Sequence, residues 1–74
     1  MQKIFIVSPV EARYKTQQAI RQTFSHSTVI FQTDECTFDV TAVEEDEQGN
    51  RKELPELRID VLSELFPILY ADKY

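Results

Sequence analysis

Apolar and polar positions follow a strand-like pattern in three separate parts of the chain. Ile4–Val7 is a continuous apolar run, which is typical of a central strand covered on both faces. Residues 28–33 are rich in β-branched and aromatic side chains, which favour a second strand. After a tight turn at Asp34 and Glu35, residues 36–43 alternate between apolar and polar and predict a third strand. Its inward side chains are expected to be Cys36, Phe38, Val40 and Ala42.

Between the first two strands the sequence carries the signals of a helix N-terminus. Ser8 fits an N-cap, Pro9 fits the first helical position, and Glu11 completes a capping box. From there to about Phe24 the small and apolar residues share one face of a helical wheel. That face consists of Ala12, Thr16, Ala19, Ile20, Thr23 and Phe24. We therefore predict a helix that is capped by Ser8, runs from Pro9 to about Phe24 and packs closely on the sheet.

The C-terminal third of the chain fits two different structures. Residues 57–61 alternate between apolar and charged side chains, as a strand does, but they also fit a helix that begins at Pro55. In the helical alternative Leu57, Val61, Leu65 and Ile68 share one face. We favour a short strand that pairs back on residues 36–43, followed by a helix over about residues 60–69. Pro67 is expected to kink or end that helix.

The order of these elements, β-α-β-β-(β)-α, predicts an α+β fold in a single domain over residues 1–74. We expect a small, largely antiparallel sheet of three to four strands, with two helices packed on one face. A chain of this length buries only about 60% of the surface that it exposes when unfolded, so a deep catalytic cavity would consume much of its core.

Candidate catalytic and metal-binding residues are scarce in this sequence. A single cysteine, Cys36, forbids an intrachain disulfide, and a single histidine, His26, cannot build an ordinary zinc site. Cys36 is expected on the inward side of a strand and His26 in a solvated connection, so neither forms a nucleophile–base pair. We expect no catalytic residue, no cofactor, no metal and no enzymatic activity. The lone thiol and the absence of an export signal favour the cytoplasm.

Charge is distributed unevenly along the chain. The formal net charge is −5, from 13 acids and 8 bases. Residues 1–30 carry four bases and one acid, whereas residues 31–60 carry ten acids and three bases. The span from residue 34 to residue 47 contains seven acids and no base. These candidate partner-binding residues are Asp34, Glu35, Asp39, Glu44, Glu45, Asp46 and Glu47.

Two interpretations of this acidic cluster stay open. It is either a solvated surface that resists aggregation, or an electrostatic docking surface for a basic protein. The second interpretation predicts a small acidic protein-binding module or inhibitor that acts stoichiometrically. Nucleic-acid-binding proteins are common basic partners. On such a protein the acids would occupy a groove that otherwise binds DNA or RNA.

Other functions and partners remain as alternatives. One is a structural or oligomeric subunit, with a homodimer formed through the apolar C-terminal segment from Leu65 to Tyr70 and Tyr74. Another is a nucleic-acid binder that uses the basic first helix, through Arg13, Tyr14, Lys15 and Arg21. We expect no direct nucleic-acid binding by the acidic part and no membrane association.

Overall fold

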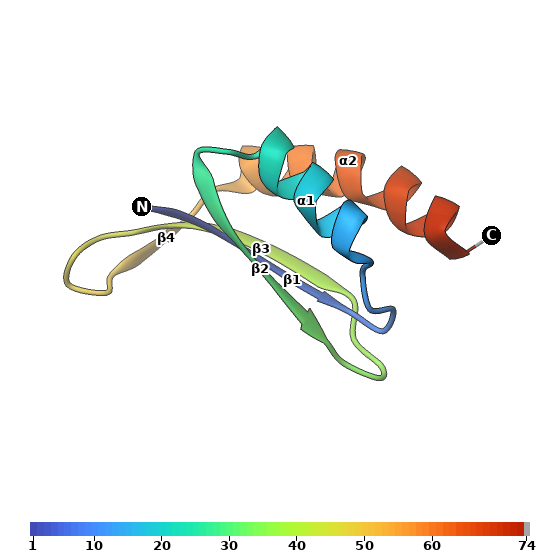
Figure 1. Ribbon diagram of the computed structural model, residues 1–74. Coiled ribbons are helices and arrows are strands. Elements are labelled where there is room, and N and C mark those ends of the chain that lie inside the picture. Colours follow the sequence, from blue (N-terminus) through green and yellow to red (C-terminus); the bar gives the residue numbers. More distant parts are fainter. Residues whose placement is uncertain (74) are drawn as a thin grey trace.

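Two helices lie together on one face of a four-stranded sheet, so the molecule has two layers (Figure 1). This computed structural model describes residues 1–73, with the side chains of residues 1–67. The elements are β1 (Gln2–Ser8), α1 (Tyr14–Thr23), β2 (Ser27–Thr33), β3 (Asp39–Glu45), β4 (Arg51–Glu53) and α2 (Pro55–Lys73). The α+β prediction, with two helices on one face, is confirmed.

The sheet is mixed, with the strand order β2-β1-β3-β4. β1 runs parallel to β2 and antiparallel to β3, and β3 runs antiparallel to β4. β1 is a central strand, as its apolar run predicts. The expectation that both its faces are covered is wrong, because both helices pack on the same side. Ile4 and Ile6 point toward the helices and are buried, whereas Phe5 and Val7 point to the opposite face and are half-buried.

The hydrophobic core lies between the sheet and the helices. Its buried members come from all three long strands and both helices: Ile4, Ile6, Ile20, Val29, Val40, Ala42, Val61 and Leu65. Burying a side chain of this kind contributes roughly 1.5–3 kcal/mol, so these few residues supply much of the driving force for folding.

α1 begins at Tyr14, five residues later than the capping signals predict. Ser8 is the last residue of β1, where its carbonyl accepts a hydrogen bond from the Asp34 N–H at 3.0 Å. Its hydroxyl oxygen accepts the Val10 N–H at 3.1 Å, which makes a local turn in place of a helix cap. Of the predicted inner helical face, Thr16 and Ile20 are buried.

The third strand begins at Asp39 and not at Cys36. Cys36 is exposed, so the expectation of an inward thiol is wrong. The Asp34 carboxylate accepts the Cys36 N–H at 3.0 Å, and this turn keeps the segment out of the sheet. Phe38 packs toward α2, with its ring centroid 5.2 Å from that of Phe66, while 39% of its surface remains exposed. Val40 and Ala42 are buried as predicted.

Residues 55–61 are helical, so the favoured strand is wrong and the helical alternative is correct. Pro55 is the first residue of α2, where the missing N–H costs nothing, and the Arg58 N–H donates to the Leu54 carbonyl at 3.0 Å. β4 takes the predicted strand's place beside β3. Val61 and Leu65 are buried on the helical face, and α2 continues past Pro67, which therefore does not end it. The Ile68 side chain lies outside the described residues.

Candidate functional site

The structure divides the seven predicted acids into two groups at opposite ends of β3. Asp34 and Glu35 lie in the turn after β2, and Asp39 is the first residue of β3. Glu44 and Glu45 end β3, and Asp46 and Glu47 follow in the β3–β4 connection. Because a strand rises about 3.3 Å per residue, roughly 20 Å separates the two ends. The acids therefore bracket the sheet and do not form one continuous patch.

At one end, Glu44 and Glu45 are paired with cations of the same chain. The Glu44 carboxylate lies 2.8 Å from the N-terminal ammonium of Met1. The Glu45 carboxylate accepts hydrogen bonds from Lys3 Nζ and from Arg51 Nε, both at 2.8 Å. These two hydrogen bonds lower the pKa of Glu45 from its ordinary value of 4.5. The charge of Glu45 thus holds β1, β3 and β4 together and is largely compensated.

Asp46 organises the β3–β4 connection. Its carboxylate accepts the N–H groups of Gln48 and Asn50, each at 2.9 Å, and the Asn50 side-chain amide at 3.1 Å. Hydrogen bonding from Asn50 lowers the pKa of Asp46 from its ordinary value of 3.8. Among the described residues, neighbouring Glu47 makes no hydrogen bond or ion pair, so its carboxylate is available to an external cation.

The acids at the other end of β3 also divide into those that accept hydrogen bonds within the chain and one that does not. The Cys36 N–H donates to Asp34 and lowers the pKa of that carboxyl. Asp39 accepts a hydrogen bond from the Thr41 hydroxyl at 3.3 Å. Glu35 has no such contact within the described part of the chain. Each end of β3 therefore presents one fully available carboxylate, Glu35 or Glu47, beside acids that also fix the local backbone.

Surface grooves accompany both acidic ends. One, of about 520 Å³, is lined by Met1, Lys3, Glu45, Asp46 and Glu47. The other, of about 430 Å³, runs along β3 and is lined by Asp39, Val40, Thr41, Ala42, Glu53, Leu54, Pro55 and Arg58. Both are open to solvent, and the second lies along the edge of β3 beside the start of α2.

The sheet face that the helices leave uncovered was missed by sequence reasoning. The strand register places Phe5 of β1 between Ile30 of β2 and Thr41 of β3 on this side, with Val7 next along β1. Ile30 is 39% exposed, and Phe5 and Val7 are half-buried. The signal was present in the apolar run of β1, which supplies hydrophobic side chains to both faces of the sheet.

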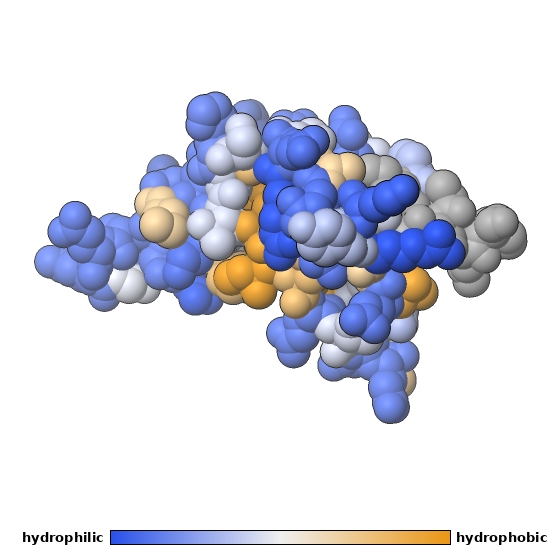
Figure 2. Space-filling view, in the orientation of Figure 1, coloured by the Kyte–Doolittle hydropathy of each residue, from blue (hydrophilic) through white to orange (hydrophobic). Residues whose placement is uncertain are grey.

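Charged side chains frame this apolar centre. The Arg51 guanidinium lies 5.1 Å from the centre of the Phe5 ring, in cation–π geometry. Lys3, Glu45 and Glu53 lie on the same face by register. In Figure 2 the end of the molecule formed by the β3–β4 hairpin is hydrophilic, and hydrophobic surface gathers in the middle, below the helices.

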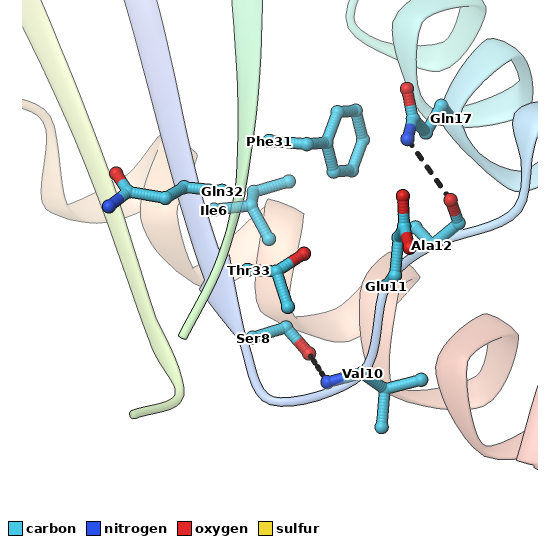
Figure 3. Close-up of a pocket in the computed structure, with 9 residues that line it drawn as sticks. All are labelled: Ile6, Ser8, Val10, Glu11, Ala12, Gln17, Phe31, Gln32 and Thr33. Atoms are coloured by element: carbon cyan, nitrogen blue, oxygen red, sulfur yellow. Dashed lines mark hydrogen bonds between the residues drawn. The ribbon is translucent and has the colours of Figure 1, made fainter. Parts of the chain in front are cut away.

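A small cavity lies where the parallel pair β1 and β2 ends beneath α1 (Figure 3). Parallel strands often hold ligands at their carboxyl ends. This cavity has a volume of about 90 Å³, however, well below the roughly 300 Å³ of ordinary ligand pockets. Two of its polar side chains also have partners on the chain, because Ser8 Oγ accepts the Val10 N–H and Gln17 Nε2 donates to the Ala12 carbonyl at 3.0 Å.

The described residues give no indication of a metal site or of a membrane-spanning helix. In residues 1–67, no three His, Cys, Asp or Glu side chains are placed to hold a metal ion. None of the helical segments searched over the same described part combines the length and the apolar character needed to cross a membrane.

The predicted basic helix is also divided by the structure. Arg13, Tyr14 and Lys15 are exposed at the start of α1. Arg21 instead contacts its own sheet, since its guanidinium lies 5.1 Å from the centre of the Phe31 ring and donates to the Val29 carbonyl at 3.4 Å. A nucleic-acid surface on α1 therefore has fewer available cations than the sequence indicates.

Comparison of the chain with protein-family models, with curated proteins and with solved structures finds no significant match.

Proposed function

We propose that this protein is a small binding module that engages a basic protein stoichiometrically through the uncovered face of its sheet. The observation that carries the proposal is the arrangement of that face, which has an apolar centre at Phe5, Val7 and Ile30 and acidic groups at both ends of β3. An apolar centre with a charged rim is the usual anatomy of a protein–protein interface.

The acids have two separate roles in this proposal. Glu45 and Asp46 hold the strands and the connection in place through their hydrogen bonds, so they shape the surface. Glu35 and Glu47 have their charge available and attract a basic partner. Charges of this kind raise the association rate and select the partner more than they add to the final affinity.

The separation of the acids also bears on nucleic-acid mimicry. A row of acids that replaces a phosphate backbone needs regularly spaced, uncompensated charges. Here roughly 20 Å of strand separates the two groups, and Glu44 and Glu45 are paired with cations of the same chain. The geometry supports a protein partner with an apolar centre and a basic rim better than it supports a nucleic-acid mimic.

The test uses matched charge reversals on the two layers of the molecule. Protein captured from source cells on the immobilised chain is purified, and its binding to variants is measured at several salt concentrations. The Glu35→Lys/Glu47→Lys variant should lower the association rate by at least tenfold at low salt and flatten its salt dependence. Glu56→Lys/Glu64→Lys makes the same charge change on exposed positions of α2 and should have little effect.

A second pair of variants tests the face itself. Thr41→Arg places a bulky cation beside Phe5, and it should weaken binding mainly through faster dissociation. Ser63→Arg makes the same kind of change on the exposed side of α2 and serves as the control. If Thr41→Arg folds normally and binds like the wild type, the uncovered face is not the docking surface and the proposal fails.

A further inference from the structure

The two edges of the sheet differ in length and in charge. β4, at one edge, has three residues, Arg51, Lys52 and Glu53, and all are charged. Beyond β4, the free edge of β3 is covered, since the Leu54 N–H donates to the Ala42 carbonyl and Arg58 Nε donates to the Val40 carbonyl at 2.7 Å. β2, at the other edge, has seven residues and no charged side chain. Short, charged or covered edges resist pairing with another chain, and β2 is the least protected.

Two hydrogen bonds show which backbone groups of β2 face outward. The Asp34 N–H points to β1, where it donates to the Ser8 carbonyl. Backbone N–H and C=O groups point to opposite sides at successive residues of a strand, so those of Val29 and Phe31 point away from β1. The contact of Arg21 with the Val29 carbonyl, from outside the sheet, agrees with this assignment.

The sequence of β2 is chemically symmetric about its central residue. Ile30 stands in the middle, with apolar Val29 and Phe31 on either side. The next positions outward are polar, Thr28 and Gln32, and the outermost both carry a hydroxyl, Ser27 and Thr33. Antiparallel pairing of this strand with a second copy about a twofold axis at Ile30 places like beside like at every position.

We infer that the protein forms a symmetric homodimer through antiparallel pairing of β2 with β2 of a second copy. Ile30 lies opposite Ile30 of the second copy in a non-hydrogen-bonded pair. Val29 lies opposite Phe31 of the second copy in a hydrogen-bonded pair, because both present their backbone groups outward. Full pairing of residues 27–33 forms about eight hydrogen bonds and joins the two sheets into one.

Charge placement is compatible with this twofold axis. Antiparallel pairing keeps the acidic turn of one copy, at Asp34 and Glu35, at the opposite end of the interface from the same turn of the other copy. The seven residues of the strand separate the two turns by roughly 26 Å, more than twice the Debye length at 0.1 M salt. In the same register Asp34 lies opposite His26 of the second copy, which removes any clash of like charges.

One existing contact is exchanged when the dimer forms. Arg21 Nη2 donates to the Val29 carbonyl at 3.4 Å, at the long end of the range for such a bond. The backbone N–H of Phe31 from the second copy replaces it. The dimer also joins two uncovered sheet faces, because Phe5 pairs with Ile30 on that side of the sheet. The inference does not depend on the proposed protein partner.

Site-specific disulfides test both the dimer and its register. Directly opposed residues in a non-hydrogen-bonded antiparallel pair have Cα atoms about 4.5 Å apart, within the range that a disulfide spans. In a Cys36→Ser background, Ile30→Cys should oxidise to a covalent dimer of about 17 kDa, twice the 8.7 kDa of the chain. Thr28→Cys or Gln32→Cys alone should stay monomeric on reducing-agent-free gels, whereas a mixture of the two should crosslink.

Light scattering of the unmodified chain gives an independent readout. Its mass should rise from 8.7 kDa toward twice that value with increasing concentration, and more so at high salt, where two copies of charge −5 repel less. The Ile30→Lys variant should stay monomeric, because pairing would place the ammonium groups of the two copies opposite each other. The Ile59→Lys variant, which carries the same change at an exposed position of α2, should still dimerise. A monomer at millimolar concentration, or crosslinking of Thr28→Cys alone, would overturn the pairing, and neither result concerns the proposed basic partner.

Discussion

Glu45 shows how the role of a single acid depends on residues far away in the sequence. Its partner Lys3 lies 42 positions earlier on β1, and its second partner, Arg51, lies on β4. No local sequence pattern predicts either contact. From the sequence, Glu45 is therefore only one of seven candidate docking acids. The structure makes it the ion pair that ties three strands together, next to the uncovered face.

We expect Glu45→Gln to lower the stability of the protein at pH 7 and to reduce its dependence on pH. The pKa of Glu45 in the folded protein lies below its ordinary value of 4.5. Its stabilising effect is therefore present above about pH 4.5 and is lost as the pH falls toward the lower, folded value. Urea unfolding at pH 7 and at pH 3 should show a larger difference in stability between wild type and variant at pH 7 than at pH 3.

Glu64→Gln, which makes the same change on an exposed position of α2, is the control for this experiment. A constant difference between Glu45→Gln and the wild type at both pH values would mean that the carboxylate contributes packing and not charge.

At the scale of elements, local signals and tertiary pairing compete, and the outcome differs at each end of the chain. The capping signals at Ser8 and Glu11 are overridden because Ser8 completes β1 and bonds to the turn after β2. At Pro55 the local signal for a helix start prevails, since the pairing that a strand there would provide is supplied by β4. Short-range patterns located every long element but could not set these boundaries.

The β3–β4 hairpin gives a prediction at this scale. Gly49 has a φ of 84°, in the left-handed region, and a Cβ added there would meet nothing within 4 Å. Gly49→Ala should therefore destabilise the protein through backbone strain alone, by about 1 kcal/mol. Gly49→Asn should cost less, because asparagine adopts this conformation more readily. The stability of both variants is measured from the midpoints of urea unfolding. An alanine variant as stable as the wild type would contradict the prediction of backbone strain at Gly49.

At the scale of the whole molecule, two sequence expectations are mutually inconsistent, and their conflict locates the candidate site. Two helices on one face leave the other face open, yet the apolar run of β1 predicts cover on both. The first expectation is correct, so Phe5 and Val7 remain half-buried on a face with no layer over it. A chain that violates its own pattern in this way usually does so where it functions.

The thin core of this two-layer molecule leads to the last prediction. Leu65 is fully buried between α2 and the sheet, and truncating such a leucine costs about 2–5 kcal/mol. At roughly 0.05–0.15 kcal/mol per residue, a 74-residue chain has about 4–11 kcal/mol in total. Leu65→Ala should therefore lose a large share of this stability, and its thermal transition followed by circular dichroism should fall by roughly 10 °C or more. Phe66→Ala is the control, because Phe66 is the next residue and is 40% exposed; this variant should retain a cooperative transition. Equal losses of stability in the two variants would mean that the core does not lie between the two layers.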